Sequence, residues 1–412
     1  MKSKISPRLR LLLLSGIYAL GIFGILASDS SSDGNGVLLC TLEIRGIAPV
    51  IGPAGEVWVG LLAETEDGTV DRVSRLGGNG LEQVAVDIAT GNSENAIRTI
   101  AIAVDGANTG DIYVGGDFSE GILRLNPDGT LDAGFAVGTG FNGRVNSIVP
   151  AADGSGDIYV GGNFSAYQGV LAGGLVRLKD VGTRDDGFVA IVSNIEAVAM
   201  EGSGSSDVYG GGSGFPPLER YNSFGTPDTT PEFNPSLGIF PVYTIAPALD
   251  GTDDVYVGGG FSDPNRIIRL SQDGTPDNLF VVGTGFDDDV TRIVRANDGS
   301  NEIYAGGEFT AYQGSPAGGI VRLGITGSNV NSFVTGAGFS DPTDLSSQSQ
   351  VISLARAADG STDLYVGGGF TRYDGRIVNG LVRLNANGSL DTGFDVRIIV
   401  NGRTCDNSTV RR

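Results

Sequence analysis

The amino-acid sequence predicts an all-β fold, a seven-bladed β-propeller of four-stranded antiparallel blades over residues 37–404, preceded by an N-terminal signal peptide or anchor. Three observations predict this fold. A unit of about 50 residues recurs along the chain, each unit reads as short strands joined by glycine-rich turns, and no segment beyond the N-terminal region has a helical period. A sheet this small cannot bury both faces alone, but sheets repeated around an axis pack on one another.

Each unit carries one aromatic residue within a short strand, an acid two residues before it and one arginine in the following strand. Glycine makes up 67 of the 412 residues, and turns such as Asp153-Gly154 suit tight hairpins. The aromatic residues are Trp58, Tyr113, Tyr159, Tyr209, Tyr256, Tyr304 and Tyr365. The arginines are Arg75, Arg124, Arg177, Arg220, Arg269, Arg322 and Arg383.

The most regular units resemble a known repeat family. The run YVGGDFSEGILRLNPDGTLDAGF (Tyr113–Phe135) resembles the delta-sixty repeat of bacterial exported proteins, and NGLVRLNANGSLDTGF (Asn379–Phe394) is similar to it. The resemblance covers residues 111–394 and implies a β-propeller in an exported protein. It implies little about the ligand, because propellers host many unrelated activities. A two-sheet sandwich and a linear β-solenoid remain the alternative folds.

The N-terminal region has the layout of a secretory signal peptide. Residues 1–10 are basic, residues 11–27 carry no charge, and small polar residues follow. We expect a signal peptide over residues 1–28, with an uncleaved anchor as the alternative, and a flexible linker over residues 29–36. The protein is then periplasmic, at the cell surface or secreted, and it contacts a membrane only through that segment if it is retained. Residues 405–412 are predicted to be a C-terminal tail.

The composition excludes several function classes. The chain has no histidine, which excludes Ser-His-Asp and Cys-His catalysis and His-ligated zinc. Its net charge of −21 argues against a nucleic-acid partner. No catalytic constellation is visible, so we predict that the protein is not an enzyme. The alternative is a carboxylate-based glycan hydrolase or lyase that uses Glu201, Glu219 or the Asp287–Asp289 cluster.

The recurring arginines are interpreted as structural. An aspartate follows the arginine by eight residues in five units, and a guanidinium can hold such a carboxylate across a turn. Val330 takes that place in the sixth unit, where another acceptor is required. The five predicted clasps pair Arg124 with Asp132, Arg177 with Asp185, Arg220 with Asp228, Arg269 with Asp277 and Arg383 with Asp391.

The two cysteines, Cys40 and Cys405, bracket the repeats. An exported protein with an even, minimal number of cysteines is expected to hold a disulfide. A propeller brings its first and last strands together, so the two residues can meet there. Two free buried thiols are the alternative.

Longer loops in three units carry a tyrosine next to an amide or a carboxylate. An exposed tyrosine ring can cover the apolar face of a sugar while the polar neighbour binds its hydroxyls. The alternative is that each tyrosine packs against a neighbouring blade. The candidate ligand-binding residues are Tyr167, Gln168, Tyr312, Gln313, Tyr373 and Asp374.

The Asp-Gly turns and the cluster Asp287, Asp288 and Asp289 raise the question of calcium. Calcium requires six to eight oxygen ligands, usually including several carboxylates. Hairpin turns account for most of these acids, so we expect no cofactor, with calcium at the aspartate cluster as the one possibility.

We therefore expect an exported binding module that recognises a surface partner through one rim of the propeller. The partner is a cell-surface polysaccharide, an envelope component or a protein. A structural scaffold of an extracellular assembly is the first alternative, and the carboxylate-based hydrolase or lyase is the second.

Overall fold

The computed structural model describes residues 40–410, apart from 66, 89–96, 105, 107, 203–205, 215, 230–231, 236–237, 263–264 and 342–349. The predicted signal peptide (1–28) and linker (29–36) lie outside the described residues. The described part of the chain is all-β and holds no helix that is long and apolar enough to cross a membrane.

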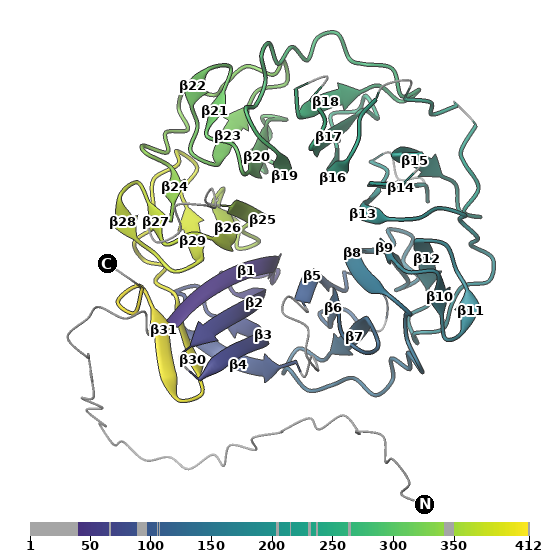
Figure 1. Ribbon diagram of the computed structural model, residues 1–412, viewed down its shortest axis with the longest axis horizontal. Coiled ribbons are helices and arrows are strands. Elements are labelled where there is room, and N and C mark those ends of the chain that lie inside the picture. The colour runs from purple at the N-terminus through teal and green to yellow at the C-terminus, as the bar shows by residue number, and fades with distance from the viewer. Residues whose placement is uncertain are drawn as a thin grey trace, which may run out of the picture.

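Small antiparallel sheets stand around a central opening, and each turns one strand toward it (Figure 1). Each of these inner strands contacts the inner strand of the next sheet, and β25 contacts β1, so the circle closes. The inner strands are β1 (Cys40–Pro49), β5 (Ile97–Ile102), β8 (Arg144–Pro150), β13 (Ile195–Met200), β16 (Val242–Pro247), β19 (Val290–Arg295) and β25 (Gln350–Arg356).

Two further strands complete the regular part of each sheet. The second strands carry the recurring aromatic residues: β2 (Val57–Thr65), β6 (Ile112–Gly116), β9 (Ile158–Asn163), β14 (Val208–Gly212), β17 (Val255–Gly259), β20 (Ile303–Gly307) and β26 (Leu364–Gly369). The third strands carry the arginines: β3 (Gly68–Leu76), β7 (Ile122–Leu125), β12 (Leu175–Leu178), β15 (Leu218–Tyr221), β18 (Ile267–Leu270), β23 (Ile320–Leu323) and β29 (Leu381–Leu384). The register sets each aromatic residue opposite its arginine, as Tyr113 is opposite Arg124.

The fourth strand differs from the sequence prediction. A complete one is present in the first sheet as β4 (Glu82–Asp87), whereas the other described sheets have a single bridge in its place, such as Leu125 to Leu131. The backbone N–H of Asp132 donates to the carbonyl of Arg124, and the N–H of Phe135 then donates to Asp132. This turn brings Phe135 edge-on against Tyr113, so the chain leaves the sheet before a strand can form.

Neighbouring sheets approach closely because a glycine in the second strand faces the next inner strand. A Cβ atom on Gly115 would lie 2.6 Å from Cγ1 of Val145 in β8, and one on Gly258 would lie 2.7 Å from Cγ1 of Val290 in β19. The glycines therefore allow aliphatic side chains of the next sheet to fill the space above them.

The longer loops of three units form small hairpins at the outer side of the ring. Gln168 and Gly169 have φ values of 50° and 75°, which is the left-handed backbone of a two-residue hairpin turn. The hairpin strands are β10 (Ala166–Tyr167), β11 (Val170–Leu171), β21 (Ala311–Tyr312), β22 (Ser315–Pro316), β27 (Arg372–Tyr373) and β28 (Arg376–Ile377). A further strand from outside the loop, β24 (Phe339–Ser340), pairs with β27.

A disulfide and a C-terminal hairpin secure the seam between the last sheet and the first. Cys40 and Cys405 are bonded, as predicted, with their Cα atoms 5.2 Å apart. Cys405, placed by the sequence at the start of a tail, lies within β31 (Arg403–Asp406), which pairs with β30 (Arg397–Val400) beside the first sheet (Figure 1). The buried Asn379 amide accepts from the N–H of Leu42 and donates to the carbonyls of Cys40 and Asp406.

Candidate functional site

The recurring arginines lie inside the sheets, bound to carboxylates. The five predicted clasps are all within ion-pair distance; the longest joins Arg177 to Asp185 at 3.8 Å, and the shortest joins Arg124 to Asp132. Each of these arginines is almost fully buried, and Arg220 is only 1 % exposed. A buried guanidinium needs such partners to offset its lost hydration.

The sequence analysis missed closer partners for three of these arginines. Arg177 bonds Asp153 at 2.6 Å and Asp157 at 2.9 Å, and both distances are shorter than that to the predicted Asp185. Asp157 is the acid two residues before the aromatic Tyr159, and Asp153 comes from the turn before it. Arg269 and Arg383 hold the equivalent carboxylates.

In the unit that carries Val330, Arg322 binds acids of the same two kinds. It pairs with the turn residue Asp298 and, at 2.6 Å, with Glu302. The arginine also lies 5.3 Å from the ring centre of Tyr304. The clasps are thus built from local carboxylates and an aromatic face. These partners occupy the guanidinium groups and leave few N–H groups for a ligand.

The three loop tyrosines do not present their rings to solvent. Tyr167, Tyr312 and Tyr373 are at most 2 % exposed, and their hydroxyl groups donate to backbone carbonyls of their own units. Each ring packs against a phenylalanine, as Tyr167 does on Phe141 at 4.6 Å. The rings are therefore buried by packing, whereas the sugar-binding prediction requires exposed rings.

The polar neighbours of these tyrosines occupy the tips of the hairpins. Gln168, Gln313 and Asp374 have φ values between 46° and 50°, which is the left-handed backbone that the hairpin turn requires. The side chain of Gln168 donates to the carbonyl of Ala136, and Asp374 accepts from the N–H of Ala337. These side chains therefore stand at the hairpin tips without an exposed aromatic ring beside them from the same loop.

The aspartate cluster does not converge on a cation position. Asp287 accepts from the backbone and hydroxyl of Thr310, while Asp288 accepts from the N–H of Asp289, which itself pairs with Arg266. Among the described residues no group of three acids or cysteines could hold a metal ion. The three carboxylates therefore face different neighbours, and calcium at this cluster stays a prediction.

The candidate catalytic acids are also separated. Glu201 is buried and pairs with Arg220 at 3.4 Å, which ties it to a clasp. Glu219 lies in β15, where burial raises the pKa of its carboxyl. Neither residue lines the central cavity described next.

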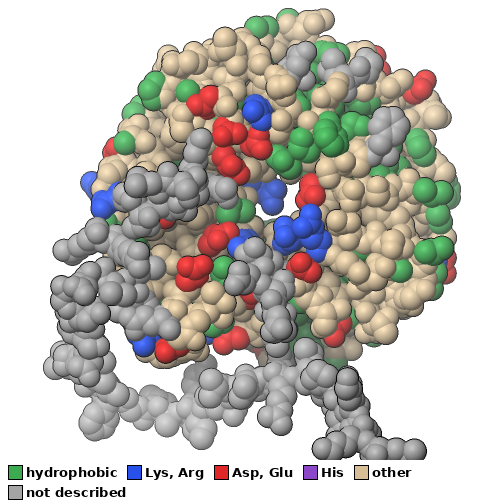
Figure 2. All heavy atoms as spheres, viewed as in Figure 1, with side chains coloured by type: hydrophobic (Ala, Val, Ile, Leu, Met, Phe, Trp, Pro, Cys, Tyr) green, Lys and Arg blue, Asp and Glu red, His purple; other side chains and the backbone are tan. Residues whose placement is uncertain are grey.

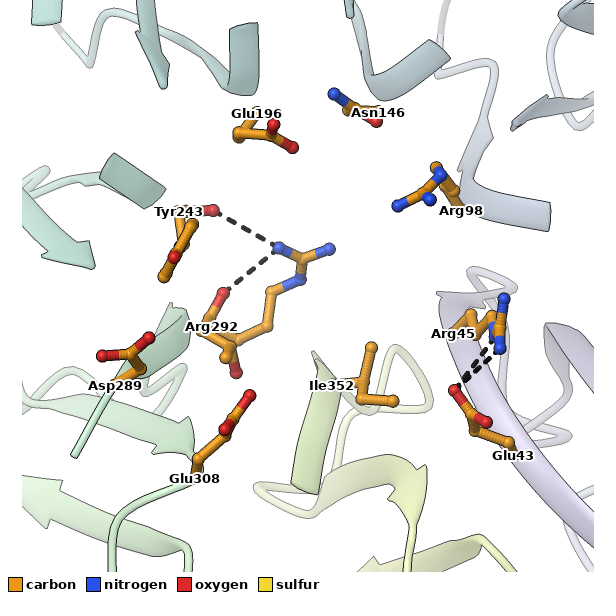
Figure 3. A pocket seen from close by; sticks show the side chains of 11 residues that line it. Glu43, Arg45, Arg98, Asn146, Glu196, Tyr243, Asp289, Arg292, Glu308 and Ile352 are labelled. Carbon is orange, nitrogen blue, oxygen red and sulfur yellow. Dashed lines mark hydrogen bonds and ion pairs between the residues drawn. The ribbon is translucent and has the colours of Figure 1, made fainter. Parts of the chain in front are cut away.

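A site that the sequence analysis did not identify lies at the mouth of the central channel. Every described inner strand has a register shift that leaves one residue unpaired with the second strand. Such a bulge turns its side chain away from the regular face. These residues line one cavity, in which Figure 3 shows most of them. We call them the bulge ring: Arg45, Arg98, Asn146, Glu196, Tyr243, Thr291 and Ile352.

The bulge ring breaks the repeat while its surroundings keep it. The residue before each bulge is always a fully buried isoleucine or valine, such as Ile97 or Val145. The bulge residues themselves are two arginines, an asparagine, a glutamate, a tyrosine, a threonine and an isoleucine. A position that varies within otherwise repeated strands makes a unique surface, and this variation was the available sequence signal.

The cavity at this mouth has a volume of about 370 Å³. Glu43, Asp289, Arg292 and Glu308 line it together with the bulge ring. Figure 2 shows basic and acidic side chains gathered around the opening, and Figure 3 shows the guanidinium of Arg292 extending into its middle. The mouth is therefore a polar, mixed-charge cavity at the end of a rigid ring.

Burial and nearby like charges shift the pKa values of these groups. Burial, followed by the nearby Arg144, lowers the pKa of Arg98. Burial raises the pKa of Glu196 despite three arginines around it, and burial together with Asp289 raises the pKa of Glu308. Groups whose charged forms are disfavoured in this way gather at functional sites.

The fold and this mouth define a class of protein: a β-propeller with a non-repeating polar site on its axis. Comparison with known families agrees on the fold. Residues 108–135, 154–188, 253–280, 299–328 and 357–394 match the family described as "Domain of unknown function (DUF5122) beta-propeller". The chain is thus built from β-propeller repeats. No curated protein matches its sequence.

Solved structures resemble the chain at low sequence identity. A functionally unknown protein of Desulfotomaculum acetoxidans is 15 % identical, with a TM-score of 0.52 over 78 % of this chain and 90 % of that one. Sqt1 of Chaetomium thermophilum is 13 % identical, with a TM-score of 0.48 over 85 % and 97 %. The dihydro-heme d1 dehydrogenase NirN is 14 % identical, with a TM-score of 0.47 over 89 % and 75 %. The first likeness shows the fold alone, and the others add nothing to it.

Proposed function

We propose that the protein is an exported, seven-bladed β-propeller that binds a cell-surface partner in the mouth of its central channel. The observation that carries this proposal is the bulge ring, because it is the place where otherwise repeated strands become unique. The partner is a polysaccharide, an envelope component or a protein, and the protein is not an enzyme.

The ring is suited to binding because its inner strands are rigid. The Oγ of Ser147 accepts from the N–H of Val198, and Oγ1 of Thr244 accepts from the N–H of Ile293, so side chains also join neighbouring sheets. A cavity of about 370 Å³ falls within the usual range for small-ligand sites. Preorganised polar groups reduce the entropy lost on binding.

Export is supported by the buried disulfide between Cys40 and Cys405. Structural disulfides persist in oxidising compartments such as the periplasm and the cell exterior. The basic and apolar layout of residues 1–28 agrees with this address.

The test uses a steric plug. Ile352 lines the mouth without carrying charge, so Ile352→Trp should fill part of the cavity and leave the ion pairs intact. Ile191 is 92 % exposed, so Ile191→Trp is the matched control. Both variants and the wild-type full-length chain are labelled and incubated with cell-envelope fractions and with a glycan array.

We expect the plug to weaken binding of the envelope ligand at least tenfold and the control to leave it unchanged. Added calcium or chelator should make no difference, because we propose no cofactor. Binding that survives the plug would contradict a channel site and would favour a rim contact or a scaffold role.

A further inference from the structure

Two arginines at the channel mouth differ from all the clasp arginines. Within the described residues, Arg98 and Arg292 have no carboxylate within 4.0 Å, although the chain carries 48 acids and a net charge of −21. Three of the four acids that line the cavity are paired with other arginines: Glu43 with Arg45 at 3.0 Å, Glu196 with Arg144 at 3.7 Å, and Asp289 with Arg266. The fourth, Glu308, is within 4.0 Å of no cation in the described part of the chain. Two guanidinium groups therefore share the cavity without a partner acid.

Neither guanidinium has its hydrogen-bonding capacity filled. The Nε of Arg98 is buried and has no acceptor. One terminal nitrogen of Arg292 donates to the carbonyls of Tyr243 and Thr291, at 3.4 and 3.2 Å. Figure 3 shows the rest of that guanidinium in the open middle of the cavity, with the Arg98 side chain directed toward the same space. A guanidinium provides five donors in a planar fork, and the terminal N–H groups that Figure 3 shows toward the cavity face a ligand position.

An unpaired acceptor lies in the same cavity. Asn146 is only 6 % exposed, and its Nδ2 donates to the carbonyl of Ile195 at 2.9 Å. Its Oδ1 is buried without a donor. An unfilled buried acceptor costs free energy unless a ligand supplies a hydroxyl or an N–H group. The mouth thus offers guanidinium donors and one amide acceptor side by side.

We propose that the channel mouth binds an oxyanion carried by a hydroxylated ligand, the carboxylate of an acidic sugar residue. Arg98 and Arg292 bind the carboxylate oxygens, and Asn146 accepts a hydrogen bond from a hydroxyl of the ring. Planar carboxylates match the guanidinium fork. A phosphate group shares the oxyanion chemistry and is the other source to be tested. The inference rests on the proposed function, because it names the ligand class of the same site.

The experiment is titration calorimetry of the full-length chain at fixed pH and ionic strength. The probes are galacturonate oligomers, inorganic phosphate and the neutral sugar glucose. We expect saturable binding of galacturonate and none of glucose. Arg98→Gln and Arg292→Gln, measured separately, should each weaken binding at least tenfold, since a hydrogen bond to a charged group is lost in each.

Arg376→Gln is the matched control, because Arg376 is exposed in β28 and is not among the residues that line the cavity. It removes the same charge and should change the affinity less than twofold. Equal weakening by this control would overturn the site, because the effect would then come from the overall charge. Melting curves establish that each variant is folded, and either arginine variant alone suffices for the test.

The outcomes separate this inference from the proposed function. Binding of phosphate without galacturonate would overturn the acidic sugar and keep the oxyanion. No saturable binding of either probe by the folded wild-type chain would overturn the oxyanion site altogether. In that case the effect of Ile352→Trp on envelope binding still decides whether the mouth is a binding site.

Discussion

The clasp arginines and the channel arginines show two uses of the same side chain in one molecule. Arg220 is 1 % exposed and bonds Asp228 at 2.8 Å and Glu201 at 3.4 Å. Arg98 is half-buried at the channel mouth, and no carboxylate lies within 4.0 Å of it in the described part of the chain. The clasp recurs in unit after unit, whereas the channel arginine occurs at a position where other inner strands carry asparagine, tyrosine or isoleucine.

The difference teaches how to separate structure from function in a repeat protein. A charge that repeats together with its partner is part of the sheet, because each unit must satisfy its own buried groups. A charge that does not repeat and lacks a partner costs stability, and that cost is retained only where the group has another role.

The largest expected effect is on stability, from removing one arginine of each kind. Arg220→Leu leaves Asp228 and Glu201 without their buried cation and should lower the free energy of unfolding by about 3–5 kcal/mol. Burial already lowers the pKa of Arg98. Because Arg98→Leu removes a cation without an ion pair, it should change the free energy of unfolding by less than about 1 kcal/mol. Chemical denaturation of both variants measures the contrast, and similar losses would abolish the distinction drawn above.

A smaller effect on stability is expected from replacing two glycines, one packed tightly between neighbouring sheets and one with little around it. Gly258→Ala would place a Cβ 2.7 Å from Val290 and 2.8 Å from Thr244, and such overpacking should cost about 1–3 kcal/mol. Gly369→Ala meets only Glu43, at 3.7 Å, so it should leave stability unchanged or raise it by up to about 1 kcal/mol. Thermal melts compare the two variants. Equal tolerance at both positions would mean that the sheets are not interlocked as described.

The smallest effect is a pH dependence of one clasp. Burial acts to raise the pKa of Asp298, but hydrogen bonds from Ser300 and Arg322 outweigh it and bring that pKa down to about 2, from an ordinary 3.8. Because the folded pKa is lowered, the stabilisation is present above pH 3.8 and is lost as the pH falls toward 2.

Asp298→Asn should therefore lower stability at pH 7 and flatten the decline in stability between pH 4 and pH 2. Denaturant titrations at several pH values measure this decline. Asp186→Asn removes the same charge from a side chain that is 82 % exposed and controls for net charge. A decline as steep as that of the wild-type chain would show that Asp298 contributes nothing to acid sensitivity.

Much of the fold could be predicted because local patterns carry it. The repeated aromatic and arginine positions placed the second and third strands, and the bracketing cysteines led to the disulfide. The fourth strand was predicted and is a single bridge in most described sheets, because Phe135 and its equivalents pack inward. The spacing of the arginine and the phenylalanine indicates that the chain turns back along the third strand, but not how many of its residues pair there.

The candidate site was not predicted from its one sequence signal, the variable position in the repeated strands, because its residues come together only when the ring closes. Arg98 and Arg292 are 194 positions apart in the sequence and line one cavity. The loop tyrosines were predicted to bind a ligand because a polar residue follows each of them in the sequence. Tyr373, however, is 1 % exposed and packs against Phe339. A bulge also has no sequence signature of its own, so the direction of Asn146 or Glu196 depends on the register of the folded sheet.

The disulfide makes a covalent circle of 365 residue positions out of nearly the whole described chain. A protease that cuts any exposed hairpin tip, such as the turn at Gly169 or Gly375, therefore leaves one molecule rather than two fragments. The cut ends stay beside each other, held by the sheets on both sides. Such a molecule keeps its parts together after a cut that would release a fragment of an open chain.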